Sequence, residues 1–384
     1  MEKKKIYFIG GLHFFLDSYM GFFAVYLVIA GLDPLKSAII ITITMFAGNI
    51  LQPIMGYMAD RIRGKLPLFI GLFLTSVSMS MIGLTTSYTV LFVLVLFGQL
   101  GSALFHPAGA NVAGAAGMTK RDTSFAIFST IGTIGFALSQ PYFSAFTARF
   151  GAQSSFVMAI PALLLAFYYL FFSRMEIHGH GDGLHLKELA GLIIRRFVPI
   201  ILLFLIMVFR TVFVMSMDFF LAKTFAEWGF LRVVYSSANA VFMLSSAGGI
   251  FAVGHLSNYI KPRKLLFVSL VGFLPFFLLF LYSGNQGNLF TTLLFLALTG
   301  FILNGGHAAN IVMGHRITPE MTSTISGILM GFAWATASFG PTLCARLSGV
   351  FPKIGGLTSG LLVLSIFPLA ASLFSIFLSR EVDG

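Results

Sequence analysis

Runs of about twenty mostly apolar residues recur along the whole chain, and they restrict the fold more than any other feature. As an α-helix, each run is long enough to cross about 30 Å of hydrocarbon. Lipid offers the backbone no hydrogen-bond partners, so only helices and closed barrels span a membrane. The runs do not alternate between apolar and polar residues as the strands of a membrane barrel do. The sequence therefore predicts an all-α polytopic membrane protein.

Composition excludes a soluble domain of this length. Hydrophobic residues make up 57% of the chain and charged residues only 10%, whereas a soluble domain has about 25% charged residues. The first run contains His13 and Asp17 and lacks a small-residue cleavage site, so we interpret it as a span rather than a signal peptide. We expect twelve transmembrane helices, at residues 6–30, 37–59, 66–86, 88–113, 124–148, 153–173, 197–222, 233–258, 265–283, 289–313, 322–348 and 356–379.

The longest connection between the predicted spans divides the chain into two halves. This connection begins with a glycine-rich stretch, and its last part, LHLKELAGLIIRR, has the pattern of a short amphipathic helix on the membrane surface. We therefore expect an N-terminal six-helix bundle at residues 1–173, a cytoplasmic linker at residues 174–196 and a C-terminal six-helix bundle at residues 197–384.

Three pairs of features recur at nearly the same spacing in the two halves. The segment GYMADRIRGK is matched by GHLSNYIKPRK 198 residues later. His106 is matched by His307 after 201 residues, and Pro141 by Pro341 after 200 residues. Because three separate features share one spacing, we predict two pseudo-symmetric six-helix bundles that arose as parallel repeats.

The distribution of basic residues predicts the orientation in the membrane. With the N-terminus inside, the cytoplasmic loops and termini hold seventeen of the 24 Lys and Arg residues, and the outer side holds six. Cytoplasmic loops of membrane proteins carry such an excess, so we expect both termini in the cytoplasm and a multi-pass protein of the inner (plasma) membrane. Basic loops that face anionic lipids also explain the net charge of +11 without any nucleic-acid partner.

A charged motif follows the second predicted span. Its residues are Gly56, Asp60, Arg61 and Lys65. Together with twelve predicted helices and a central loop, the pattern G-x-x-x-D-R resembles the major facilitator superfamily, and the resemblance covers the whole chain. It implies that Asp60 helps to latch the two halves together on the cytoplasmic side. The alternative is a group of charges that only fixes topology. In this chain Arg63 and Gly64 stand in exchanged order relative to the familiar motif.

A second motif points to a branch of that superfamily. The segment LFHPAGANVAG in the fourth predicted span resembles the fosmidomycin-resistance-like drug exporters, which carry a His-Pro pair in this helix. The chain departs from the family at two places. Gly98 stands where many proton-coupled exporters have an arginine, and Gln140 precedes Pro141 where glycine is usual. Arg210 is a candidate for the missing cationic role.

Ionisable residues lie near the middle of only four predicted spans. They are His13 and Asp17 in the first span, His106 in the fourth, Arg210 and Asp218 in the seventh, and His307 in the tenth. A charge that faces lipid costs at least about 2.5 kcal/mol, so these side chains are expected to face water or one another. The resemblance implies that these four helices line a central cavity.

The acidic residues are the candidates for proton coupling. Asp17 and His13 are four residues apart and therefore share one helix face. A carboxylate in a low-dielectric cavity suits the role of a proton carrier. We assign proton coupling to Asp17, His13 and Asp218, and we expect Arg210 to hold an anionic substrate. The alternatives are a purely structural His13–Asp17 contact and a solvated position for Asp218.

The two repeated histidines are the main candidates for substrate contact. Pro107 follows His106 directly, so this helix is expected to kink or loosen there. Imidazole titrates in the working pH range, which suits either substrate binding or proton relay. The alternative is a histidine that is satisfied by a backbone carbonyl. The full set of predicted substrate contacts is His106, Arg210, His307, Asn111, Asn310, Gln52 and Gln99.

These observations predict a secondary active transporter and not an enzyme. We expect proton-coupled export of a small amphipathic or anionic compound by alternating access, driven by the proton gradient without any cofactor. The chain has no G-x-x-x-x-G-K-[ST] motif for nucleotide-driven transport. Besides the small-molecule substrate, the expected partners are protons and membrane lipids, and we expect a monomer. The alternatives are uptake or exchange of an organic anion, and transport of a divalent metal ion bound by His13, Asp17, His106, Asp218 and His307.

Overall fold

The computed structural model describes residues 2–61, 65–116, 121–173, 191, 193–257, 259–318, 325, 328–351 and 355–378. This part of the chain is helical and contains no strand. It forms two compact units, Met1–Asp182 and Gly183–Gly384, and the division falls inside the predicted linker. Of the amphipathic helix predicted at residues 184–196, most lies outside the described residues, although residues 191 and 193–195 are helical.

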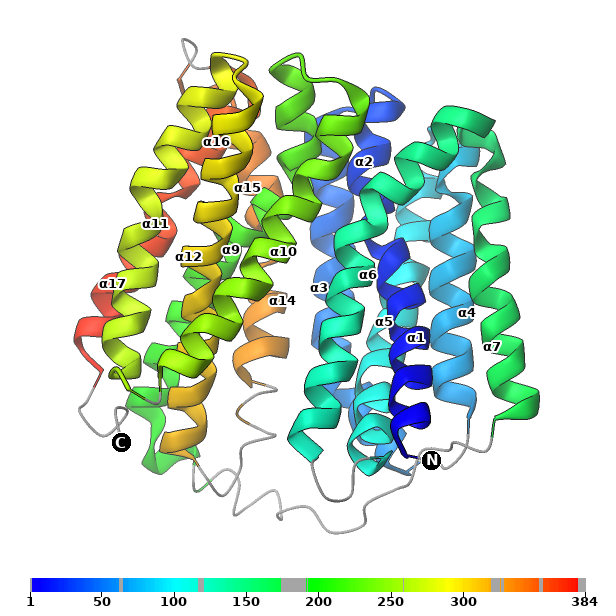
Figure 1. The fold of residues 1–384 in the computed structure, drawn as a ribbon, viewed down its shortest axis with the longest axis horizontal. Helices are drawn as coiled ribbons and strands as arrows, with labels where there is room; N and C mark the ends of the chain where they lie inside the picture. The colour runs from blue at the N-terminus through cyan, green and yellow to red at the C-terminus, as the bar shows by residue number, and fades with distance from the viewer. Residues whose placement is uncertain are drawn as a thin grey trace. The chain divides into compact units, whose positions relative to one another are not determined.

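The first unit is a bundle of long helices that run roughly parallel or antiparallel to one another (Figure 1). Its elements are α1 (Glu2–Met20) and α2 (Phe22–Ile29), α3 (Pro34–Arg61), α4 (Leu66–Ser80) with the short η1 (Met81–Leu84), α5 (Tyr88–Ala116), α6 (Arg121–Phe150), and η2 (Ala152–Ala159) with α7 (Ile160–Phe172).

The second unit repeats this plan. Its elements are α9 (Phe197–Glu227), α10 (Arg232–Leu256), α11 (Pro262–Asn285), α12 (Leu289–Ile317), a π-helical turn η4 (Ile328–Phe332) followed by α14 (Ala333–Ala337) and α15 (Gly340–Leu347), and α16 (Gly356–Leu364) with α17 (Ile366–Ile376). Its interior holds phenylalanine rings in tilted and edge-to-face contact, such as Phe213 against Phe273 and Phe277.

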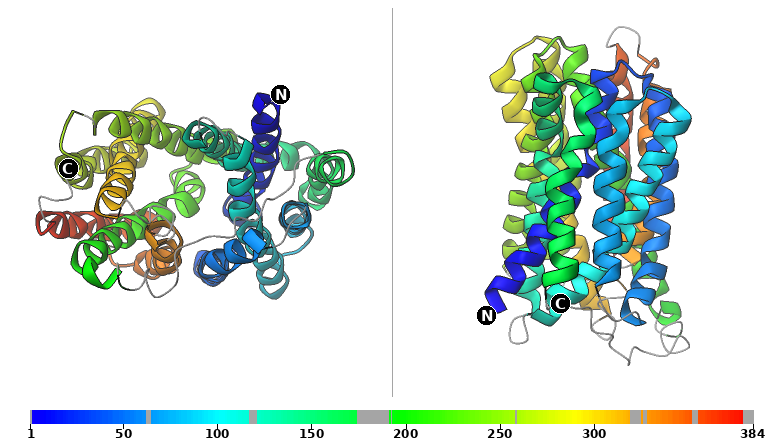
Figure 2. Two further views of the ribbon diagram at one scale, coloured as in Figure 1. Left: turned by 90° about the horizontal axis from the view of Figure 1, so that it is seen from below. Right: turned by 90° about the vertical axis from the view of Figure 1, so that its right-hand side faces the viewer.

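Eleven helical segments in the described part of the chain are long and apolar enough to cross a membrane. The one remaining predicted span, at residues 124–148, falls on α6, which is less apolar but has 30 residues and therefore a length of about 45 Å. The N-terminus and the end of α7 lie at the same end of the first unit (Figures 1 and 2). An even number of crossings is needed for that, so we count α6 as a span.

Glycines let α1 and α6 approach closely in the first unit. The α-carbons of Gly132 and Gly135 on α6 face the ring of His13 and the backbone of Phe14, so closely that a methyl group at either position would overlap them. Small residues permit such contacts between membrane helices. The close packing brings the His13 ring into the interior of the bundle, where it stacks on Phe128 of α6 at 4.1 Å between ring centres.

Glycines play the same part between α10 and α12 of the second unit. Gly249 of α10 packs against the backbone of Phe301, and Gly300 of α12 packs against Phe242. One turn further along α12 lies the segment NGGHAAN, which carries the polar residues Asn304, His307 and Asn310. The close helix contact therefore brings polar side chains of α12 within hydrogen-bonding reach of α10.

Candidate functional site

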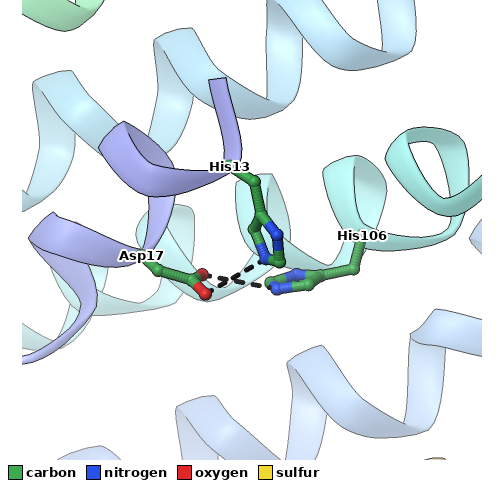
Figure 3. A group of neighbouring side chains, drawn as sticks. All are labelled: His13, Asp17 and His106. Carbon is green, nitrogen blue, oxygen red and sulfur yellow. Dashed lines mark ion pairs between the residues drawn. The ribbon is translucent and has the colours of Figure 1, made fainter. Parts of the chain in front are cut away.

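Three predicted site residues meet inside the first unit. Nε2 of His13 lies 3.1 Å from Oδ2 of Asp17, one turn along α1, and Nε2 of His106 on α5 lies 3.4 Å from Oδ1 (Figure 3). The two imidazole rings stand nearly perpendicular, with their centres 5.0 Å apart. His13 and Asp17 are largely buried, while 33% of the His106 side chain is exposed. We call these three residues the acidic cluster.

Backbone carbonyls orient both imidazole rings of the acidic cluster. Nδ1 of His13 lies 2.9 Å from the carbonyl oxygen of Phe128, and Nδ1 of His106 lies 2.8 Å from that of Ser102. A carbonyl oxygen can only accept a hydrogen bond, so each Nδ1 carries the proton and donates it. In the neutral form of either ring, Nε2 is then a bare lone pair directed at the Asp17 carboxylate.

This arrangement requires an additional proton. Two bare Nε2 atoms opposite one carboxylate would repel it, because all the facing atoms would be acceptors. A proton on an imidazole or on the carboxyl turns one contact into a hydrogen bond and makes the cluster neutral, and a second proton makes it positive. An uncompensated charge is costly in a low-dielectric interior. With one added proton, the acidic cluster is neutral and one of its contacts becomes a hydrogen bond.

The α5 helix stays helical on both sides of Pro107. Proline removes one backbone donor from the helix, and the expected loosening is not seen as a break in the element. His106 nevertheless uses a carbonyl of its own helix, that of Ser102, as the sequence alternative suggested, and the Ser102 hydroxyl lies 3.0 Å from the same ring nitrogen. One nitrogen of His106 is thus satisfied within α5, while the other faces Asp17.

The second unit contains a buried arginine that is held by neutral groups. Only 4% of Arg210 on α9 is exposed. Its Nη1 donates to Oδ1 of Asn304 at 2.5 Å, and its Nη2 lies 3.3 Å from Nδ1 of His307, both on α12. Longer contacts reach Met207 and Thr211. Among the described residues, no carboxylate lies within the 4.0 Å of an ion pair with this guanidinium.

The hydrogen bonds around Arg210 fix the states of its partners. A guanidinium has only donors, so Nδ1 of His307 accepts, and His307 is neutral with its proton on Nε2. Asn304 donates through Nδ2 to Ser246 on α10 at 2.8 Å, which leaves Oδ1 for Arg210. This network links α9, α10 and α12. We call Arg210, Asn304 and His307 the basic cluster.

Other predicted residues make contacts of a different kind. Asn310 donates to the carbonyl oxygen of Leu203 at 3.1 Å, and Gln52 donates to Asn49 on its own helix. Asp218 is enclosed in the second unit, two turns along α9 from Arg210 and beyond ion-pair distance from it. Gln99 is half-buried and packs against Gly48 of α3.

Most of the predicted cytoplasmic motif lies outside the described side chains. Lys65 stands just before α4 and donates to the carbonyl oxygen of Leu170 on α7 at 3.0 Å, within its own unit. The side chains outside the described residues are those of Gly56, Asp60, Arg61 and Asn111.

Sequence reasoning missed several residues that shape the two clusters. Asn304 stands one turn before His307 on α12, and this i, i+3 spacing was a usable signal. The backbone carbonyl of Phe128 gave no signal, because any residue supplies one. Trp334 is one of two tryptophans in the chain, and its ring lies 6.4 Å from that of His307. It belongs to the segment GFAWATASFGP, which ends at Pro341, one of the features repeated between the two halves.

Comparison with known proteins gives a family match and distant relatives. A family model described as Major Facilitator Superfamily matches residues 6–341. An uncharacterized MFS-type transporter, YfnC, of Bacillus subtilis (strain 168) is 26% identical over 330 residues, which cover 84% of this chain and 78% of that protein. The fosmidomycin resistance protein of Escherichia coli (strain K12) is 24% identical over 318 residues, covering 80% and 76%.

Solved structures share the fold at low identity. A bacterial homolog of the human lysosomal transporter Spinster, in an inward-facing and occupied conformation, superposes with a TM-score of 0.80 at 15% identity and covers 98% of this chain and 96% of that one. The nucleoside transporter NupG superposes with a TM-score of 0.78 at 13% identity, covering 99% and 100%.

Proposed function

Because this chain belongs to the major facilitator superfamily, and is therefore a multi-pass membrane transporter of small molecules rather than an enzyme, we propose that it couples export of a small amphipathic or anionic compound to proton movement. The acidic cluster is the proton site in this proposal, and the basic cluster contacts the substrate. Alternating access, the exchange of a central site between the two sides of the membrane, connects the two events.

One observation carries the proposal: Asp17 faces two imidazole nitrogens that can bond to it only through an added proton. A structural ion pair would need only one histidine beside the carboxylate. A histidine that served packing alone would need no carboxylate beside it. The cluster is neutral with one proton while it is closed off from water, and it can lose that proton when hydration stabilises the free carboxylate. Loading and release can therefore follow the opening of the transporter to either side.

The relative named for fosmidomycin resistance supports an export direction and a first substrate to try. Purified protein in proteoliposomes with an imposed pH gradient should accumulate fosmidomycin on the acidic side, against its own gradient. The accumulation should collapse when an ionophore dissipates the pH gradient. Each substrate taken up should be accompanied by proton efflux, which a pH-sensitive dye in the lumen reports. Equal transport with and without the pH gradient would refute proton coupling.

Uptake or exchange of an organic anion would use the same residues, with the substrate moving in the opposite direction. The direction of the pH gradient that drives accumulation distinguishes export from uptake. Export by antiport requires that protons and substrate move in opposite directions, whereas symport moves them together. The assay above, repeated with the pH gradient reversed, distinguishes these outcomes because only one sign drives accumulation.

A divalent metal ion is the second candidate substrate. The Nε2 atoms of His13 and His106 and a carboxylate oxygen of Asp17 lie within 4.8 Å of one another. Two imidazoles and a carboxylate suit transition metals, and metal-binding histidines usually donate their other nitrogen to a carbonyl, as both do in this cluster. The other two predicted ligands, Asp218 and His307, belong to the second unit. Calorimetric titration with Zn²⁺ and Mn²⁺, against a His13→Ala control, tests this candidate.

The topology, oligomeric state and latch complete the proposal. We propose that both termini face the cytoplasm of a cell whose inner membrane holds the protein as a monomer. Asp60 stays the proposed cytoplasmic latch with Gly56, Arg61 and Lys65. The bond from Lys65 to the Leu170 carbonyl supports a role for Lys65 in holding the cytoplasmic ends of its own bundle together.

A further inference from the structure

The basic cluster offers hydrogen-bond donors that have no acceptors. Nε of Arg210 is buried and makes no hydrogen bond among the described residues. Nε1 of Trp334, the donor of the indole ring, is also buried without a partner. His307 carries its remaining proton on Nε2, because Nδ1 accepts from Arg210. Three neighbouring side chains therefore present N–H groups, and the tryptophan and arginine groups lack a partner.

The sequence places these donors together from three helices. Arg210 comes from α9 and His307 from α12, in direct contact. Trp334 comes from α14, which packs against α9, and its ring lies beside that of His307. The π-helical turn η4 immediately precedes α14, and such turns occur frequently at functional sites in membrane and soluble helices. Asn304 holds the guanidinium in place through its bond to Ser246.

The missing group must be an anion. The hydrogen-bond partners of the buried guanidinium are all neutral, and Asp218, which interacts with Arg210 electrostatically, lies beyond ion-pair distance. A buried charge is normally paired in direct contact, so the guanidinium has room for an anion. Every open position in the group is a donor, so an amine or a metal cation would find no acceptor there. Carboxylates and phosphates have the several lone pairs that such a fork of donors satisfies.

We propose that Arg210, His307 and Trp334 bind the oxyanion group of an organic anion, a carboxylate or phosphonate carried on an apolar body. Nη and Nε of Arg210 supply the charge, and the histidine and tryptophan N–H groups select the oxygen atoms. The indole ring and Met207 provide apolar surface beside the charge. This inference rests on the proposed transport function only in taking the anion to be the cargo. Binding itself can be measured without any flux.

The two tryptophans allow a direct binding assay. Trp228 packs against Phe225, Phe280 and Gly284 at the far end of α9, so Trp228→Phe leaves Trp334 as the sole tryptophan. This full-length variant, in dodecyl maltoside, is titrated with benzoate, phenylphosphonate and the neutral benzamide while Trp334 emission is recorded. Both anions should give a saturable change, and benzamide should give none. An equal response to benzamide would overturn the proposal.

Charge variants identify the residue that binds. In the same background, Arg210→Gln should weaken benzoate binding by roughly 30-fold or more. Arg346→Gln removes an exposed arginine from α15 of the same unit and should leave the affinity unchanged. His307→Gln keeps the guanidinium and should weaken binding by roughly fivefold. It also serves as the second variant should Arg210→Gln not run as a single species in gel filtration. Unchanged affinity in a folded arginine or histidine variant contradicts the assignment.

Two further experiments complete the test. One distinguishes a lipid headgroup from a free solute as the bound anion, and the other distinguishes the oxyanion site from the transport function. Displacement of benzoate by added phosphatidylglycerol assigns the oxyanion site to a lipid headgroup, and its failure assigns the site to a free solute. Benzoate binding without any gradient-driven flux refutes the transport function and keeps the oxyanion site. Driven flux that is as fast in Arg210→Gln as in the unaltered protein refutes the site and keeps the function.

Discussion

At the scale of single residues, the repeated histidine has two different chemical settings. His106 in the first unit faces a carboxylate, while His307 in the second faces a guanidinium. Each partner comes from the first span of its own unit. A carboxylate favours the protonated form of its histidine, and a guanidinium favours the neutral form with an N–H left to donate. We propose that one position of the repeat serves proton binding in one half and anion binding in the other.

Replacing the shared carboxylate should separate the proton from the cargo. In Asp17→Asn, the amide cannot take up a proton, and its Nδ2 can donate to one of the two Nε2 atoms without any charge. Substrate binding should therefore persist, while accumulation driven by a pH gradient should fall to the level measured without a gradient. Asp33→Asn replaces an exposed carboxylate at the start of α3 and should keep driven transport. Undiminished driven transport in Asp17→Asn would remove Asp17 from the mechanism.

At the scale of helices, pattern and structure agree where a single helix decides the outcome. The spans and the shared face of His13 and Asp17 follow from hydropathy and helical period. The major facilitator fold followed instead from the resemblance carried by the motif after the second span, and the family match confirms it. Contacts between helices, in contrast, do not follow from the sequence pattern. The pairing of His106 with Asp17 depends on how α1 and α5 pack, and the tautomer of His13 depends on the carbonyl of Phe128. Sequence periodicity does not encode which carbonyl meets which ring, so the His106–Asp17 pairing and the His13 tautomer could be found only in the three-dimensional structure.

The contact between α1 and α6 should be essential to the acidic cluster. A methyl group at Gly132 would overlap the His13 ring. Gly132→Ala should therefore lower the free energy of unfolding by about 1–3 kcal/mol and abolish driven transport by displacing His13. Gly11→Ala, on α1, meets no atom within 4 Å and is the matched control. Thermal unfolding in detergent and flux in proteoliposomes measure the two effects. Normal transport in a folded Gly132→Ala protein would show that the ring position is not critical.

At the scale of the whole molecule, the single cysteine permits a clean test of orientation. Cys344 is buried, so Cys344→Ala gives a background without reactive thiols. Arg149→Cys at the end of α6 should react with a membrane-impermeant maleimide added to intact cells. Lys264→Cys near the start of α11 should react only after the cells are opened; both positions are exposed in the structure. The opposite labelling pattern would place the termini outside.

We propose that the Asp60 latch acts on the equilibrium between the inward-open and outward-open forms. Asp60→Asn should leave the fold intact, favour the inward-open form and slow turnover, because an electrostatic contact on the cytoplasmic side is lost. Faster hydrogen exchange at the cytoplasmic ends of the helices, together with a lower transport rate, would report this shift. Asp182→Asn, which removes a carboxylate from the linker, is the control. If exchange and rate match those of the control, Asp60 serves topology alone.

In the proposed mechanism, the bond between the His13 ring and the Phe128 carbonyl limits how many protons can leak through the protein. Proton conduction through an imidazole needs one nitrogen to receive a proton while the other releases one. Nδ1 of His13 is tied to a buried carbonyl, so a proton that reaches Nε2 has to leave from the same atom. We therefore propose that His13 stores a proton rather than conducting one. A cluster closed in this way takes up and releases its proton once per transport cycle and does not let protons flow continuously down the gradient.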